Sequence, residues 1–140
     1  MNKQQSGFTL VEIAIVLVII GLLLGGVLKG QELITQAKIK NVANDLNGMT
    51  AAIYAYQDRY KRLPGDDPSA TRWPLTATLP TTVGNNAVSG AYSSTTNTDE
   101  SRLFWAELRL AGFIAGATDT LANAAAQPIN AAGGIVGAQN

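Results

Sequence analysis

The chain has 140 residues, enough for one compact domain, and its ten Lys and Arg residues balance ten Asp and Glu residues. This balance indicates no basic field for nucleic acid and no acidic field for cationic partners. The sequence contains neither cysteine nor histidine, which excludes disulfide bonds, thiolate nucleophiles, Cys/His zinc sites and histidine-based acid–base catalysis.

The apolar residues are concentrated near the N-terminus. Residues Phe8 to Leu28 form an apolar run of 21 residues in which Glu12 is the only ionisable side chain. A helix of this length spans about 30 Å, the hydrocarbon thickness of a bilayer, and it satisfies its own backbone groups in lipid. The run exceeds the core of about 7–15 residues typical of secretory signal peptides, and no Ala-x-Ala-like site follows it. We therefore expect a retained membrane helix over residues 8–28.

The charges that flank this helix leave its orientation open. The short leader, residues 1–7, contains Lys3, whereas Lys29, Lys38 and Lys40 follow the apolar run. A count of positive charges would place the C-terminal side in the cytoplasm. The family resemblance described next favours the opposite orientation, with the leader in the cytoplasm.

The junction between the leader and the apolar run resembles the processing site of type IV prepilins and pseudopilins. The residues that carry the resemblance are Gly7-Phe8-Thr9-Leu10-Val11-Glu12, and the similarity extends over roughly the first 60 residues. One departure is Ser6, because many relatives have Lys or Arg at this position. The resemblance implies that a membrane aspartyl peptidase cuts after Gly7 and that the new N-terminal residue, Phe8, is then N-methylated.

The resemblance also implies a cellular setting and a set of partners. These are the prepilin peptidase/methyltransferase, the lipid bilayer, an inner-membrane assembly platform, and other pilin subunits in a homo- or hetero-polymer. The chain would be a single-pass inner-membrane protein with a cytoplasmic N-terminus, and after assembly it would form part of a periplasmic or cell-surface filament. Adhesion, motility, DNA uptake and type II secretion are not distinguished.

Glu12 is an acid inside the predicted membrane helix. A charge at the centre of such a helix costs about 2.5–3.5 kcal/mol on insertion scales, but Glu12 is only the fifth residue of the run and lies nearer the interface. One interpretation is a polar residue tolerated close to the lipid headgroups. We prefer a second interpretation, which the resemblance implies. Glu12 pairs with the free α-amino group of Phe8 as a subunit enters the filament.

Gly21 and Gly25 form a Gly-x-x-x-Gly pattern, and Gly26 adds a third small residue. Small residues at this spacing let helix backbones approach closely in lipid. The alternative is that glycine is simply common in membrane helices. We predict that Gly21 and Gly25 are helix-packing positions.

No helix breaker appears between Gly30 and Pro64, so we expect the helix to continue as an amphipathic spine over residues 29–63. Its apolar residues are spaced alternately by three and four positions, which is typical of one helix face. They are Ile39, Val42, Leu46, Met49, Ile53, Tyr56, Tyr60 and Leu63. This face could form a short coiled-coil seam, but we favour its covering by a small domain folded from residues 64–140.

Residues 64–68 read Pro-Gly-Asp-Asp-Pro, a strong stop and turn. Asp66 and Asp67 could bind calcium, but the spaced oxygen ligands that calcium needs are missing, so an Asx turn is the preferred interpretation. Further along, Asn97 and Glu100 have capping-box spacing, which predicts a short helix over about residues 99–111 that ends at Gly112. Its expected buried face is Leu103, Phe104, Leu108 and Ala111, with Trp105 at the edge.

The strand signals in this C-terminal head are weak. Candidates are residues 79–83, 87–92 and 134–138, fewer than a stable sheet normally needs. The expected fold class is therefore α+β: a long N-terminal helix, transmembrane in its first half and amphipathic in its second, that carries a small head with a short helix and few strands. We hypothesise that the head is incomplete, either truncated or completed by strands of a partner chain.

Three functions from different classes follow. The first is a structural subunit of a type IV pilus or a type II secretion pseudopilus, without enzymatic activity, cofactor or metal. The second is a membrane-tethered periplasmic binding or accessory protein that does not polymerise. The third is an enzyme based on the acid pairs Asp66/Asp67 or Asp99/Glu100, which we disfavour because turn and cap positions already explain these residues.

Overall fold

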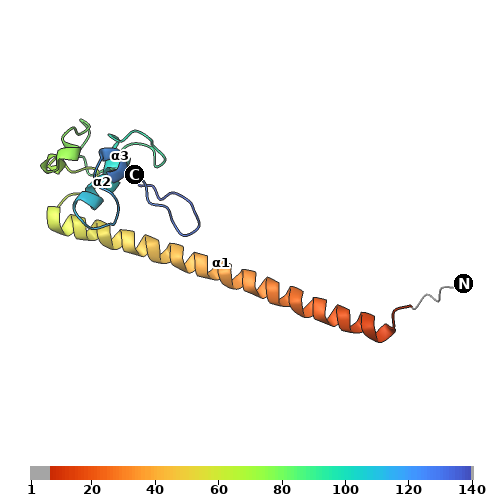
Figure 1. The fold of residues 1–140 in the computed structure, drawn as a ribbon. Coiled ribbons are helices and arrows are strands. Elements are labelled where there is room, and N and C mark those ends of the chain that lie inside the picture. Colours follow the sequence, from red (N-terminus) through yellow and green to blue (C-terminus); the bar gives the residue numbers. More distant parts are fainter. Residues whose placement is uncertain (1–6, 140) are drawn as a thin grey trace, which may run out of the picture. The chain divides into compact units, whose positions relative to one another are not determined.

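The computed structural model describes residues 7–139 and divides into two compact units, Met1–Lys38 and Ile39–Asn140. Helix α1, Leu10–Tyr60, contributes residues to both units (Figure 1). The remaining elements all lie in the second unit. They are the 3-10 helices η1 (Ala70–Arg72) and η2 (Pro74–Thr76) and the α-helices α2 (Glu100–Leu110) and α3 (Leu121–Ala124).

The N-terminal unit is helical from Leu10 onward. Gly21, Gly25 and Gly26 do not interrupt α1, which is continuous through all three positions. Its apolar side chains are exposed, from Leu10 at 92% to Ile20 at 46%. Of the helices in the described part of the chain, α1 alone is long and apolar enough to cross a membrane.

The C-terminal end of α1 lies at Tyr60, three residues before the predicted end at Leu63. Lys61 adopts a left-handed conformation with φ of 56° and donates its backbone N–H to the Gln57 carbonyl oxygen at 2.8 Å. A left-handed residue directly after the last helical residue is a common way to end a helix. Pro64 then begins the buried turn that the sequence predicts.

The head is built on the last three turns of α1. Its main core joins Ala52 and Tyr56 of α1, Phe104, Trp105 and Leu108 of α2, and Val88. Met49, Ile53, Tyr60 and Leu63 pack against this core, so the predicted apolar face is confirmed from Met49 onward. Ile39 and Leu46 belong to the same predicted face but are 65% and 48% exposed.

Helix α2 confirms the predicted C-terminal helix with two corrections. Its N-cap residue is Asp99 instead of Asn97, and the Asp99 side chain makes no capping hydrogen bond; its Oδ2 accepts from the Ser94 hydroxyl at 2.6 Å instead. Trp105 is 2% exposed and lies in the core, not at the edge. The predicted end is confirmed, since Gly112 follows with φ of 80°.

Little of the predicted β-structure forms. Among residues 7–139 there is no strand, and the antiparallel pairing is one isolated bridge between Ile129 and Ile135. One physical reason is that buried acids take backbone donors between and within the first two predicted strands, residues 79–83 and 87–92. Asp66 accepts from the backbone N–H groups of residues 84–86, and Glu100 accepts from that of Ser89.

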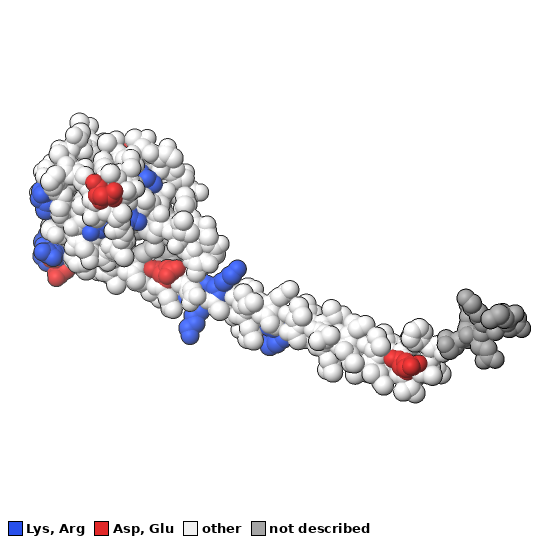
Figure 2. Space-filling model, viewed as in Figure 1, with Lys and Arg blue, Asp and Glu red and all other residues white. Residues whose placement is uncertain are grey.

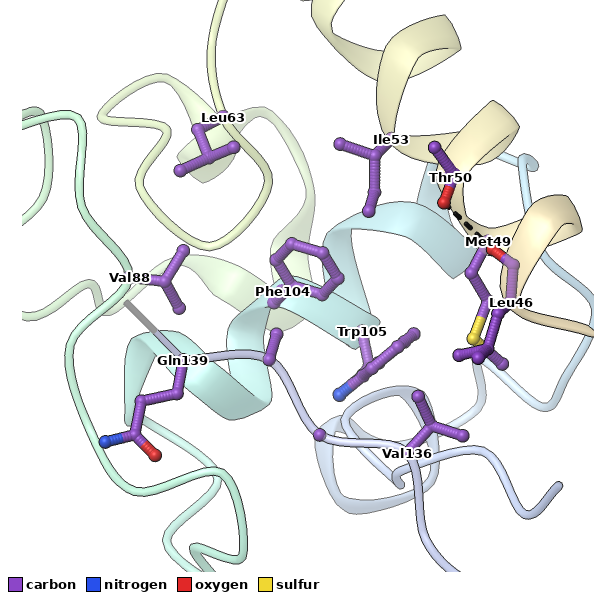
Figure 3. Close-up of a pocket in the computed structure, with 12 residues that line it drawn as sticks. Leu46, Met49, Thr50, Ile53, Leu63, Val88, Phe104, Trp105, Val136 and Gln139 are labelled. Carbon is purple, nitrogen blue, oxygen red and sulfur yellow. Dashed lines mark hydrogen bonds between the residues drawn. The ribbon is translucent and has the colours of Figure 1, made fainter. Parts of the chain in front are cut away.

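The core of the head is open on one side. A groove with a volume of about 380 Å³ runs beside Trp105 (Figure 3). Its walls are mainly apolar and come from α1, α2 and the C-terminal segment. They include Leu46, Met49, Ile53, Phe104 and Val136. The structure shows a long helix and a loop-rich head whose regular elements are short helices.

Candidate functional site

The predicted cleavage site lies just outside the helix. Gly7, Phe8 and Thr9 are exposed and non-helical, and α1 begins at the next residue. The Phe8 side chain is 85% exposed. The Gly7–Phe8 peptide bond is therefore not part of the helix, and it can bind in a peptidase active site without prior unwinding of α1. Residues 1–6 of the predicted leader lie outside the described part of the chain.

Thr9 and Glu12 form a capping box that fixes the start of α1. The backbone N–H and the hydroxyl of Thr9 donate to Oε2 of Glu12 at 2.8 and 2.7 Å. In return, the Glu12 backbone N–H donates to the Thr9 hydroxyl at 3.3 Å. This reciprocal pattern satisfies two of the free N–H groups at a helix start. The Thr-x-x-Glu spacing signals this capping box in the sequence. The family resemblance implies a role for Glu12 but none for Thr9.

The predicted partners Phe8 and Glu12 are near each other in the chain. In the described residues of this single chain, however, the hydrogen-bond partner of the Glu12 carboxylate is Thr9. Only one of the two carboxylate oxygens, Oε2, makes these bonds. The other oxygen, Oε1, takes no part in the capping box.

Gly21 and Gly25 lie on an open helix surface. A Cβ atom built on either residue would meet nothing within 4 Å apart from the neighbouring residues and the local helix backbone. On the visible face, one acidic group lies near the N-terminal end of α1, and the surface is then uncharged as far as the first basic group (Figure 2). This segment therefore offers an apolar surface with small residues at helix-packing spacing.

Comparison with known protein families agrees with these features. Residues 2–28 match the prokaryotic N-terminal methylation motif. The chain carries a type IV prepilin-type signature. This prepilin-type segment, together with the apolar α1, indicates membrane anchoring. The match ends at residue 28, so the head is not covered by it. No curated protein and no solved structure matches the chain.

The second group of candidate residues lies in the head, where Asp66 and Asp67 are both buried. The Asp66 carboxylate accepts hydrogen bonds from the backbone N–H groups of Gly84, Asn85 and Asn86, at 3.1 Å from Asn85 and 2.6 Å from Asn86. Asp66 therefore closes a loop 18 to 20 residues away, which the sequence pattern does not predict.

Asp67 makes the Asx turn that the sequence predicts, since its Oδ1 accepts from the Ser69 backbone N–H at 2.9 Å. Its Oδ2 accepts from the Arg72 guanidinium at 2.9 Å. The same guanidinium lies 4.5 Å from the Tyr60 ring centroid and 4.7 Å from that of Trp73. Arg72 is thus fixed by one ion pair and two cation–π contacts.

Two further buried acids, Glu100 and Glu107, lie on α2. Glu100 accepts from the Thr82 hydroxyl and from the Ser89 backbone N–H. Glu107 accepts from the Gly65 backbone N–H at 2.7 Å and is in contact with the Tyr56 hydroxyl at 3.1 Å. Sequence reasoning missed Glu107 because acids are normally assigned to the surface, although its spacing from Leu103 and Ala111 places it on the predicted buried face.

These acids hold the head together through backbone and side-chain donors. No group of three or more Asp or Glu residues in residues 7–139 is arranged to hold a metal ion. The proposed acid pairs are also split, since Asp66 and Asp67 face different segments. The part of the molecule with a recognisable functional pattern is accordingly the N-terminal segment, residues 7–28.

Proposed function

We propose that the chain is a structural subunit of a type IV pilus or a type II secretion pseudopilus, assembled through α1. The observation that carries this proposal is the position of the Gly7–Phe8 bond, exposed and one residue before the capping box of α1, within the methylation motif. Hydrolysis of this bond leaves a carboxylate on Gly7 and an α-amino group on Phe8. N-methylation then replaces one hydrogen of that amine.

Intact-mass measurement of the protein purified from cell membranes tests the processing step. The expected mass is that of residues 8–140 plus one methyl group. A chain that keeps Met1–Gly7 and forms no multimers would refute the proposal and favour a simple membrane tether. Gly7→Leu, which should block cutting without touching α1, is the matched control because Gly7 lies outside the helix.

We further propose that the Glu12 carboxylate pairs with the Phe8 amine of a neighbouring subunit. The charge and the capping role of Glu12 can be separated, because an amide oxygen still accepts from Thr9. Glu12→Gln should therefore keep the start of α1 while filament incorporation falls. Glu12→Ala should weaken the start of α1 and also reduce filament incorporation.

Glu32→Gln provides the control for this experiment. Glu32 is also an exposed acid on α1, and it forms a surface ion pair with Lys29 at 2.7 Å. Its neutralisation should leave incorporation unchanged, because exposed ion pairs contribute little. Normal assembly of Glu12→Gln, measured by sheared-filament yield at equal membrane levels, would contradict the pairing with the amine.

A further inference from the structure

Three buried side chains meet at one hydroxyl group in the head. Tyr56 of α1 places its hydroxyl oxygen 2.9 Å from Oδ2 of Asp67 and 3.1 Å from Oε2 of Glu107. All three residues are 0% exposed. The contact joins α1, the turn that follows Pro64, and α2, which are separated by up to 51 residues in the sequence.

The number of hydrogens does not match two ionised carboxylates. A tyrosine hydroxyl has one hydrogen to donate, and an ionised carboxylate can only accept. If both acids were ionised, one of the two short contacts would bring two oxygens together without a hydrogen between them. Such a contact between buried, unscreened negative groups is strongly unfavourable.

The surroundings show which acid holds the missing hydrogen. Asp67 faces a cation, since the Arg72 guanidinium donates to its Oδ2 at 2.9 Å. Glu107 receives only neutral donors, namely the Gly65 backbone N–H and the Tyr56 hydroxyl. Its Oε1 is buried and has no hydrogen-bond partner in the described part of the protein. Glu107 is therefore the acid with less to stabilise a charge.

We propose that Tyr56, Asp67 and Glu107 form a buried proton-binding site, in which Glu107 is protonated and the proton locks α1, the turn and α2 together. Glu107 donates to the Tyr56 oxygen, Tyr56 donates to Asp67, and Asp67 is ionised and paired with Arg72. Every short contact then has one hydrogen. The cluster also has no net charge, because Arg72 balances Asp67.

The electrostatics agree with this assignment. Burial is the largest influence on Glu107, and with the nearby Asp67 charge it raises the pKa from 4.5 to about 8, against the opposing effects of Gly65, Tyr56 and Arg72. Burial and the two carboxylates also raise the pKa of Tyr56, so its hydroxyl keeps the hydrogen. The charged or titratable groups around the site are thus Tyr56, Asp67 and Arg72.

The sign of the pH dependence follows from linkage. Between pH 4.5 and about pH 8 the folded head holds a proton on Glu107 that the unfolded chain releases. The unfolding equilibrium constant should therefore rise by about tenfold per pH unit across this window, and level off above it. The stabilising effect of the proton is fully present below pH 4.5 and is lost as the pH rises through about 8.

The test uses the full chain in detergent micelles, unfolded with guanidinium at several pH values. The fluorescence of Trp73 and Trp105 reports on the head alone, because both residues lie in the second unit. Glu107→Gln should remove the slope between pH 5 and 8. Glu100→Gln is the matched control: Glu100 is equally buried on α2, but two separate donors satisfy it, so the slope should remain.

A second measurement does not depend on the stability of a variant. Infrared spectra of the wild-type chain at pH 7 should contain the carbonyl band of a buried neutral carboxylic acid, which disappears above pH 9 and is absent from Glu107→Gln. Equal pH slopes for the wild type and Glu107→Gln would overturn the proposal, as would the absence of this band at neutral pH.

Discussion

The turn at Gly65 should tolerate no side chain, and a second glycine offers a control with the same backbone geometry. Gly65 has φ of 81° and Gly112 has φ of 80°, both in the left-handed region. A Cβ atom on Gly112 would meet nothing within 4 Å. On Gly65 it would lie 2.5 Å from the Glu100 carbonyl oxygen and 3.1 Å from two carbons of Phe104.

The two substitutions therefore share one energetic cost and differ in another. The left-handed conformation costs alanine about 1–2 kcal/mol relative to glycine, partly offset by about 0.4–1 kcal/mol from the reduced entropy of the unfolded chain. Gly112→Ala should thus lower the free energy of unfolding by about 1 kcal/mol. Gly65→Ala adds overpacking of about 1–3 kcal/mol, because backbone and core atoms must move.

The expected total for Gly65→Ala is about 2–4 kcal/mol. It is a large fraction of the roughly 5–15 kcal/mol that stabilises a domain of about 100 residues. Movement of α2 would also weaken the hydrogen bond from the Gly65 backbone N–H to Glu107, which is 2.7 Å long. Guanidinium unfolding followed by tryptophan fluorescence measures both variants. Losses that agree within about 0.5 kcal/mol would show that the close approach to α2 does not limit this position.

Three other substitutions test separate features. Asp66→Ala should lower the free energy of unfolding by about 2–3 kcal/mol, because three backbone N–H groups lose a charged acceptor, and protease digestion should then cut first within residues 82–87. Gly25→Leu should leave the membrane level of the monomer unchanged, since the position is open, yet reduce multimers in crosslinking experiments. Ile39→Gln should change the stability of the head by less than about 0.5 kcal/mol, because this side chain is 65% exposed.

The sequence predicts helix α1 well because two simple signals coincide in it. An unbroken apolar run and a regular three-four spacing both favour a helix, and each is a local property of the chain. The end points differ by two and three residues because they depend on capping. Thr9 caps the start of the helix, which the apolar run does not indicate, and Lys61 replaces the glycine usually expected after a helix.

The head was harder to predict because its organisation depends on contacts between distant residues. Charged residues are normally assigned to the surface, yet Asp66, Glu100 and Glu107 are buried. Their hydrogen-bond partners lie up to 51 residues away, so no local sequence pattern shows which donors these acids bind. Two of these acids, Asp66 and Glu100, occupy the backbone donors of residues 84–86 and of Ser89, which favours a loop over a strand ladder in this part of the head.

The capping box has a consequence for maturation, if the chain is cut as we propose. Both of its members, Thr9 and Glu12, belong to the product that remains after the heptapeptide is removed. The long helix should therefore start at the same residue in precursor and mature subunit, and cutting should alter the charge at its tip without refolding it. A subunit that waits in the membrane would then be ready for polymerisation as soon as cleavage exposes its new N-terminus.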